Sequence, residues 1–283
     1  MSLCAEISFA DMSGGQYDHA TEFLTTYEGC NMTASSPRPL GQFCWSDLMT
    51  PDVAAAQRFY AAVLGWEARE GDPQFGGYFM FFHKDLPVAG GMPDMSEGQM
   101  PSSWTSYIAV SDAAASMAAV ESNGGTVISG AMEVGTLGVM GVFLDPSGVH
   151  AGVWEPRDFM GFGAVDQVGT PRWFQLNTEK FDDVKGFYEQ TFGWTTSMMS
   201  DTADFRYATA NEGETQYAGL FDITSDPSSS PRWLVYFGVE NADTAVAAAL
   251  ANGGSVVRDV EDTPYGRLAV VADPAGAIFA LMQ

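Results

Sequence analysis

The stretch RFYAAVLGW at residues 58–66 returns as GFYEQTFGW at residues 186–194, and this recurrence decides the fold. The same spacing relates Trp45 to Trp173 (173 − 45 = 128) and the Asp145-Pro146-Ser147-Gly148 turn to Asp273-Pro274-Ala275-Gly276 (273 − 145 = 128). A repeat of this length is too long for a solenoid unit and has the size of a domain. The sequence therefore predicts one domain duplicated in tandem.

The repeat also sets the expected domain boundaries. Residues 1–40 have no counterpart in the repeat and end in the turn-rich run Ser35-Ser36-Pro37-Arg38-Pro39, which is typical of a linker. We expect an N-terminal arm and linker over 1–40, a first domain over 41–157 and a second over 168–283. Each of the two domains is long enough to bury its own core.

The charge of the chain excludes some partners. Its 12 basic and 36 acidic residues give a net charge of −24, and such a field repels phosphate backbones and anionic membrane surfaces. No stretch approaches the roughly 20 apolar residues of a membrane span, and the chain does not open with a basic region followed by an apolar run. We expect a soluble, cytoplasmic protein that binds neither nucleic acid nor membrane.

Each half of the repeat divides again into two similar blocks. In the first block a strand over 43–48 leads into Thr50-Pro51-Asp52, with an N-cap hydroxyl and a proline in the first helical turn, and the helix that follows ends at Gly65. In the second block a strand over 106–110 precedes a helix that closes at Gly124-Gly125. Strands complete both blocks. The predicted fold class is α+β, with four βαβββ modules in two tandem domains.

These motifs carry a resemblance to a known family. The Thr-Pro-Asp helix start, the helix end Phe59-Tyr60-x4-Gly65-Trp66 and the later Asp145-Pro146-x-Gly148 turn resemble the vicinal oxygen chelate superfamily of glyoxalases, bleomycin-resistance proteins and extradiol dioxygenases. The resemblance implies that two βαβββ modules form a curved, incomplete barrel around a cup. It also implies a divalent metal in the cup, which chelates two adjacent substrate oxygens and acts as a Lewis acid.

The ligand positions that the resemblance implies do not suit a metal in this chain. On the first strands they fall at or near Trp45, Thr105, Trp173 and Leu234, and on the last strands near Gly90, Gly152, Gly219 and Ala280. None of these side chains is an imidazole, thiolate or carboxylate. We therefore expect no metal and no other cofactor. The alternative is a divalent metal such as Mn, Fe, Ni or Zn held by ligands in another register.

One histidine and one carboxylate of the first domain are candidates for acid–base chemistry. His150 lies two residues before Gly152, so strand alternation places it on the inward face with Asp47. The same alternation adds ligand-binding candidates to that face: Trp45, Met49, Tyr107 and Trp154. The competing interpretation is that His150 only satisfies a hydrogen bond or faces solvent.

The second copy lacks this acid–base pair. Ile278 replaces His150 (150 + 128 = 278) and Gln175 replaces Asp47 (47 + 128 = 175). Its cup would be lined by Trp173, Gln175, Asn177, Tyr236 and Met282. The tryptophans of both copies either fill the cups as core or give a flat wall for a planar aromatic ligand.

Two functions follow as hypotheses. The first is a binder of a small, aromatic or antibiotic-like molecule that resembles the bleomycin-resistance branch and acts without the usual metal ligands. The alternative is a lyase or dioxygenase of the vicinal oxygen chelate type, either metal-dependent or using His150 and Asp47 as acid and base. The expected partner is a small molecule, and the chain is either a monomer with intramolecular domain pairing or a homodimer.

Overall fold

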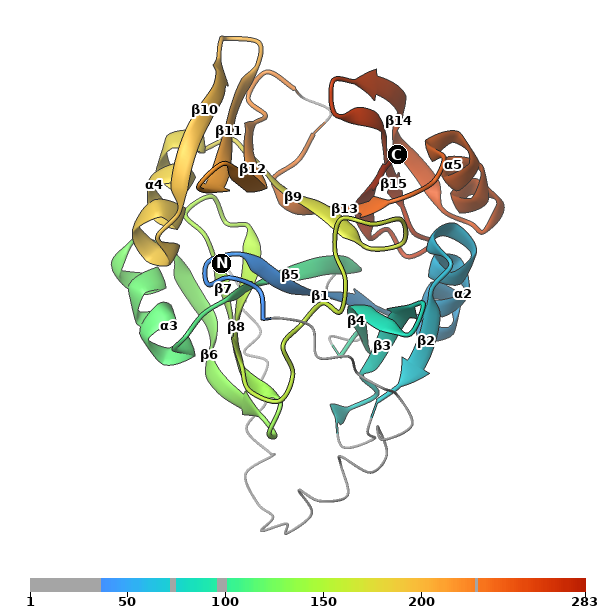
Figure 1. The fold of residues 1–283 in the computed structure, drawn as a ribbon, viewed down its shortest axis with the longest axis horizontal. Coiled ribbons are helices and arrows are strands. Elements are labelled where there is room, and N and C mark those ends of the chain that lie inside the picture. The colour runs from blue at the N-terminus through green and yellow to red at the C-terminus, as the bar shows by residue number, and fades with distance from the viewer. Residues whose placement is uncertain (1–36, 72–74, 96–100, 227–228) are drawn as a thin grey trace, which may run out of the picture.

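The computed structural model describes residues 37–71, 75–95, 101–226 and 229–283. Most of the predicted N-terminal arm over 1–40 therefore lies outside the described residues. Within them the chain forms two eight-stranded sheets, one after the other in sequence, and each sheet carries two helices (Figure 1).

The first domain follows the predicted order of two βαβββ modules. Its elements are β1 (Phe43–Thr50), α2 (Val53–Leu64), β2 (Glu67–Glu70), β3 (Phe79–His83), β4 (Leu86–Pro93), β5 (Ser103–Ala109), α3 (Ala113–Ser122), β6 (Thr126–Val134), β7 (Gly138–Leu144) and β8 (His150–Pro156).

The second domain repeats that order. Its elements are β9 (Pro171–Thr178), α4 (Phe181–Phe192), β10 (Thr195–Asp201), β11 (Arg206–Glu212), β12 (Thr215–Asp222), β13 (Arg232–Gly238), α5 (Ala242–Ala251), β14 (Ser255–Thr263), β15 (Gly266–Ala272) and β16 (Ile278–Met282). The α+β class and the four modules are confirmed.

The two sheets share one topology. The strand order is β2-β3-β4-β1-β5-β8-β7-β6 in the first and β10-β11-β12-β9-β13-β16-β15-β14 in the second, and neither sheet closes into a barrel. Within each module the first and last strands pair in parallel, and the two first strands pair antiparallel at the centre. Side chains on the concave face of the central strands therefore converge, and we call this concave region the cup of each domain.

The helix ends agree with the sequence except in one detail. The N-cap of α2 is Asp52, whose carboxylate accepts a hydrogen bond from the backbone N–H of Ala55, whereas the Thr50 hydroxyl accepts from the backbone N–H of Asp52. The prediction that Thr50 caps the helix was therefore wrong by two residues, because Pro51 and Asp52 extend the turn. Gly65 ends α2 at φ +69°, in the left-handed region that favours glycine.

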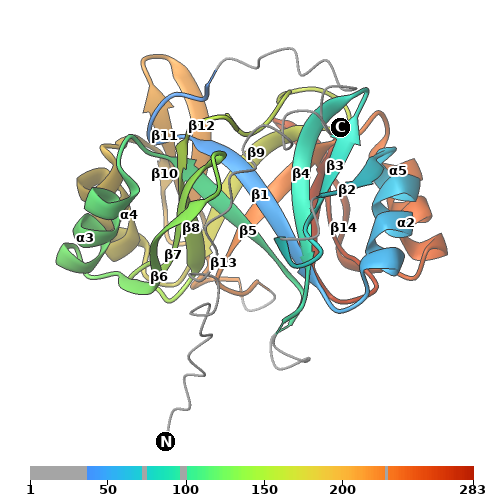
Figure 2. The ribbon, with the colours of Figure 1, turned by 90° about the horizontal axis from the view of Figure 1, so that it is seen from below.

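The domains pack through their convex faces. Helix α2 lies beside α5, and α3 lies beside α4, at the two flanks of the molecule (Figures 1 and 2). Between the flanks, Trp66 and Trp104 of the first domain pack edge-on against Phe237 of the second, with ring centroids 4.8 and 5.3 Å apart. The two cups consequently open on opposite sides of the molecule. Within the described residues no helix has the length and apolar character needed to cross a membrane.

Candidate functional site: two unequal cups

The first cup contains a buried cluster of hydrogen-bonded groups around Asp47. Its Oδ1 accepts hydrogen bonds from the Trp45 indole at 2.8 Å and from the Tyr78 hydroxyl at 2.6 Å, and its carboxylate also bonds Tyr107. The indole of Trp45 also lies 2.8 Å from the Tyr78 hydroxyl. Trp45, Asp47 and Tyr107 are all buried. They lie on the same face of the sheet, where strand alternation predicts them.

Burial changes the acidity of Asp47. Loss of hydration raises the pKa of this carboxyl from 3.8 to about 6, and the hydrogen bonds from Tyr78, Trp45 and Tyr107 oppose the shift. Burial, and after it the charge of the Asp47 carboxylate, hold the pKa of Tyr78 well above its usual value. Asp47 can therefore exchange a proton near neutral pH while its phenolic neighbours stay protonated.

Tyrosine side chains occupy the space of the implied metal ligands. A Cβ placed on Gly90 would lie 1.9 Å from the Tyr78 hydroxyl, and one placed on Gly219 would lie 1.9 Å from the Tyr207 hydroxyl. A Cβ on Gly152 would overlap the ring of Tyr107 at 2.2 Å. Longer ligand side chains have no room at these positions, and an indole N–H cannot donate a lone pair to a metal. The residues present do not fit the metal that the fold implies.

Among the described residues, no group of three or more His, Cys, Asp or Glu side chains is placed to hold a metal ion.

The first cup is covered by the segment between the domains, residues 157–170. Phe159 packs edge-on against Trp45 at 4.8 Å and accepts a hydrogen bond from the Trp154 indole at its backbone oxygen. Phe162 is 3% exposed and lies 5.4 Å from the Trp45 ring, and its N–H bonds the backbone oxygen of Cys44. The segment therefore crosses the concave side of the first sheet, and two aromatic rings cover the tryptophan there.

The second cup keeps the tyrosine and tryptophan but not the acid. The Trp173 indole donates to the Tyr207 hydroxyl at 3.0 Å, and that hydroxyl donates to Gln175 Oε1 at 3.2 Å. The amide of Gln175 donates in turn to Asn177 Oδ1 at 2.8 Å. All four polar groups are uncharged, so this cup has no acid–base pair equivalent to the one proposed for the first domain.

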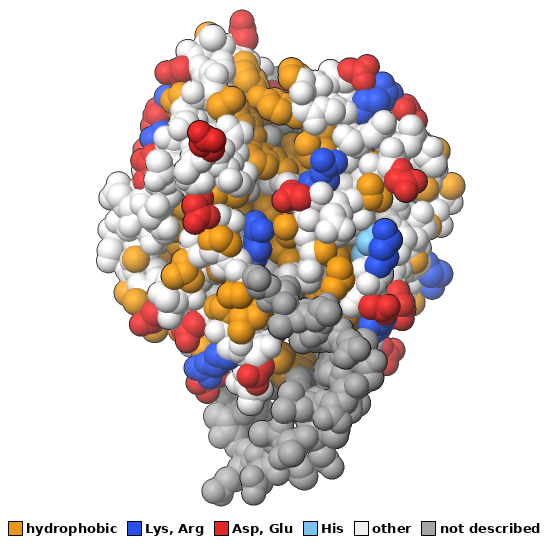
Figure 3. All heavy atoms as spheres, viewed as in Figure 1, with side chains coloured by type: hydrophobic (Ala, Val, Ile, Leu, Met, Phe, Trp, Pro, Cys, Tyr) orange, Lys and Arg blue, Asp and Glu red, His pale blue; other side chains and the backbone are white. Residues whose placement is uncertain are grey.

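The apolar lining of the second cup is buried at its base and partly exposed around it. Leu234, Tyr236 and Ala280 form a small hydrophobic cluster separate from the main core. Partly buried side chains complete it: Trp173, Leu268, Val270, Ile278 and Met282. Figure 3 shows the hollow in the upper half of the molecule, with hydrophobic side chains between the β10–β12 and β14–β15 sides. Among the described residues, no aromatic ring packs on Trp173 as Phe159 and Phe162 pack on Trp45.

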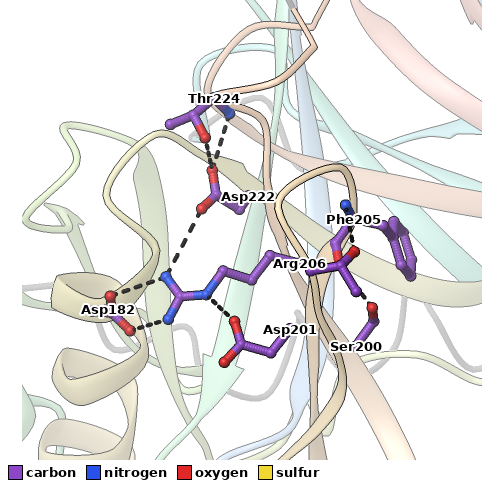
Figure 4. A network of polar contacts seen from close by, with 8 residues as sticks. Asp182, Ser200, Asp201, Phe205, Arg206, Asp222 and Thr224 are labelled. Carbon is purple, nitrogen blue, oxygen red and sulfur yellow. Dashed lines mark hydrogen bonds and ion pairs between the residues drawn. The ribbon is translucent and has the colours of Figure 1, made fainter.

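A charged network lies on the face of β11 that is turned toward α4, opposite the cup. Arg206 binds Asp182 through two nitrogens, at 2.7 and 2.9 Å, and Asp201 at 2.8 Å (Figure 4). Its neighbours along the chain, Phe205 and Tyr207, stack on each other with ring centroids 5.7 Å apart. Phe205 points away from the guanidinium and is 46% exposed, which adds an aromatic surface beside Tyr207.

His150 and Asp47 differ in burial, because His150 is exposed and Asp47 is 7% exposed. His150 is the first residue of β8 and is exposed, and the hydrogen-bond partners of Asp47 are Trp45, Tyr78 and Tyr107. Partial desolvation lowers the pKa of His150, while the charge of Asp145 opposes the shift. Met49 is partly buried on β1. The proposed acid–base role of His150 stays a prediction.

Sequence reasoning missed Tyr78, Tyr207 and the covering rings. The two tyrosines are 129 residues apart (207 − 78 = 129), so the repeat held a signal for them. Tyr78 lies just before β3, outside the strands from which the inward face was inferred. Phe159 and Phe162 have no counterpart in the repeat, and only the fold shows what they cover.

Curated relatives cover most of the chain. A mycobacterial protein named as a candidate glyoxylase, CFP32 of Mycobacterium tuberculosis, is 36% identical over 244 residues, which are 84% of this chain and 93% of that protein. The anthracycline biosynthesis protein DauV of a Streptomyces species is 34% identical over 269 residues, which are 89% of this chain and 95% of that protein.

Solved structures share the fold at low identity. The Mn(II)-bound glyoxalase from Novosphingobium aromaticivorans has a TM-score of 0.60 at 15% identity. The alignment covers 86% of this chain and 81% of the glyoxalase. The 2,3-dioxygenase LapB from a Pseudomonas species has a TM-score of 0.60 at 12% identity. The alignment covers 87% of this chain and 93% of LapB.

The family assignment follows from both halves of the repeat. The Glyoxalase/Bleomycin resistance protein/Dioxygenase superfamily model matches residues 41–151 and again residues 170–281. The chain therefore belongs to the glyoxalase/bleomycin resistance protein/dioxygenase superfamily.

Proposed function

We propose that the protein binds a small planar aromatic molecule in the cup of the second domain, without a chelating metal. The observation that carries this proposal is the difference between the cups. Trp45 is 4% exposed beneath Phe159 and Phe162, whereas Trp173 is only partly buried and lies among other partly buried apolar side chains of its cup. An open concave surface of aromatic and aliphatic side chains with a few fixed polar groups is the usual form of a small-molecule site.

The polar groups of this cup suit a ligand that carries oxygen atoms. The hydroxyl of Tyr207 and the amide of Gln175 line one wall of the cup, and Trp173 holds the hydroxyl in place. The relatives named as anthracycline biosynthesis proteins support an aromatic ligand, because anthracyclines contain fused flat rings. Hydrogen bonds from these groups would orient such a ligand in place of chelation.

Tryptophan fluorescence tests the proposal and locates the site. We expect planar aromatic compounds to change the emission of the wild-type protein and of Trp45→Phe, but not of Trp173→Phe. Trp45→Phe is the matched control because it makes the same substitution in the covered cup. A signal that survives in Trp173→Phe and disappears in Trp45→Phe would place the ligand in the first domain, and no response to any planar aromatic compound would refute the proposal.

Metal content provides an independent test. We expect protein purified without an affinity metal column to contain far less than one Mn, Fe, Ni or Zn per chain by inductively coupled plasma mass spectrometry. Aromatic binding should be unchanged after dialysis against a chelator. A stoichiometric metal whose removal abolishes binding would contradict the metal-free part of the proposal.

A second candidate function is acid–base catalysis at Asp47. The raised pKa of this carboxyl, about 6, and its contact with the Tyr78 hydroxyl at 2.6 Å favour it. We expect any lyase activity of this protein to be lost in Asp47→Asn. The same activity should survive in His150→Ala, since His150 is exposed and the hydrogen bonds of Asp47 go elsewhere.

A further inference from the structure

We infer that the ligand of the second cup carries a carboxylate on its aromatic body, and that Arg232 binds this group. The inference rests on the proposed function and adds the chemistry of one end of the ligand. It follows from the position of Arg232, from the partners of the other arginines and from the net charge of the chain.

Arg232 lies on the cup face at one end of the central strands. It is the first residue of β13 and pairs with Asn177 of β9. Leu234 and Tyr236 follow at alternate positions and belong to the apolar cluster of the cup. The guanidinium therefore starts from the same face as the aromatic surface, beside the amide pair of Gln175 and Asn177.

Arg232 has no carboxylate partner among the described residues. Its hydrogen bonds go to Ser230, through the backbone oxygen at 3.3 Å and through the hydroxyl. In contrast, Arg258 of β14 forms an ion pair with Asp226 at 2.6 Å, and Arg206 of β11 forms ion pairs with Asp182 and Asp201. A guanidinium has several N–H donors, so Arg232 keeps donors for a further acceptor.

The missing partner is informative in this chain. Within the described residues, six of the 12 basic side chains form ion pairs with carboxylates, namely Arg69, Arg157, Lys185, Arg206, Arg258 and Arg267, and Arg232 is not among them. Arg232 is partly buried, and the loss of hydration lowers its pKa. A carboxylate on the ligand would replace that hydration with paired, charge-assisted hydrogen bonds.

Charge complementarity also accounts for the class of ligand. The strong negative field of the protein repels anions in general, so an anionic ligand needs a local cation that is not already neutralised. Arg232 at the end of an apolar, aromatic cup supplies this cation while the cup takes the ring system. The structure thus favours aromatic acids over neutral aromatic compounds of the same shape.

The test compares 2-naphthoate with 2-naphthamide, which have nearly the same shape and differ in charge. By isothermal titration calorimetry we expect naphthoate to bind wild-type protein about tenfold more tightly than naphthamide, equivalent to about 1.4 kcal/mol. In Arg232→Gln the two dissociation constants should agree to within about twofold, with that of naphthamide unchanged. Unchanged naphthamide binding also shows that the variant keeps its cup folded.

A matched variant controls for the loss of one positive charge. Arg58 is exposed on α2 of the other domain, and Arg58→Gln should keep the full preference for naphthoate. Equal binding of the two probes to wild-type protein would overturn the inference and leave the proposed function standing. A preference that persists in Arg232→Gln would overturn the role of Arg232. If neither probe binds, the inference fails, whereas the wider aromatic library decides the proposed function.

Discussion

The hydroxyl of Tyr60 in the first domain donates a hydrogen bond to Asp273 Oδ2 in the second at 3.2 Å, and Tyr188 makes the reciprocal bond to Asp145 at 3.3 Å. The repeated Phe-Tyr and Asp-Pro motifs of the sequence therefore meet each other across the interface. Trp66 and Trp194 are reciprocal as well, because each indole donates at 2.7 Å to a backbone oxygen of the other half, at Gly169 and Gly41.

Loss of the Tyr60 hydroxyl should destabilise both domains. The hydroxyl also accepts a bond from the Trp104 indole at 3.1 Å, so Tyr60→Phe leaves two buried polar partners unsatisfied. We expect a cost of about 1–3 kcal/mol in the free energy of unfolding, measured by urea denaturation. Tyr188→Phe should cost a similar amount, and Tyr265→Phe, at a side chain 63% exposed, is the control. Equal stability of Tyr60→Phe and the control would contradict the prediction.

Asp47 should make stability depend on pH in a defined direction. Its folded pKa of about 6 is above its usual 3.8, so its contribution to stability is fully present below pH 3.8 and is lost as pH rises through about 6. Asp47→Asn removes this titration. Relative to wild type, the variant should gain about 2.5 kcal/mol between about pH 4 and about pH 7.5, at about 1.4 kcal/mol per pH unit between the two pKa values.

Urea denaturation at both pH values measures this change. Asp204→Asn, at an exposed position, controls for the loss of one negative charge. A difference between Asp47→Asn and wild type that is the same at both pH values would refute the prediction.

The sequence predicted the fold well and the site only in part. Trp45 and Asp47 were placed on one face because strand alternation is a local rule, and Tyr107 joined them through the pairing of β1 with β5. Burial raises the pKa of Asp47, and the Tyr78 hydroxyl whose hydrogen bond opposes this shift comes from another part of the chain. Local rules do not reach those contacts.

The rings over the first cup should be essential to its core. Phe162 is 3% exposed, and Phe162→Ala should cost about 3–5 kcal/mol in the free energy of unfolding. Phe159→Ala should expose Trp45, so that acrylamide quenches its emission more strongly. Phe205→Ala removes an exposed ring in the other domain and is the control. Unchanged quenching in Phe159→Ala would show that Phe159 does not protect Trp45.

Gly219 should accept a side chain only if Tyr207 is removed. A Cβ there would lie 1.9 Å from the tyrosine hydroxyl and 2.5 Å from its Cζ. We expect Gly219→Ala to destabilise the protein by about 1–3 kcal/mol through overpacking. The double variant Gly219→Ala/Tyr207→Ala should be more stable than the sum of the single variants, as a thermodynamic cycle from urea denaturation would show. Additive costs would mean that the two residues do not compete for space.

The reciprocal interface has a consequence for the origin of the chain. Two identical copies of one domain would form the same contacts about a twofold axis, with two equivalent sites. Joining the two copies required a connection from β8 to β9. That connection carries Phe159 and Phe162 across the cup of the first domain only. Gene fusion by itself would then have made the two sites unequal, because the connection covers one cup with aromatic rings and not the other.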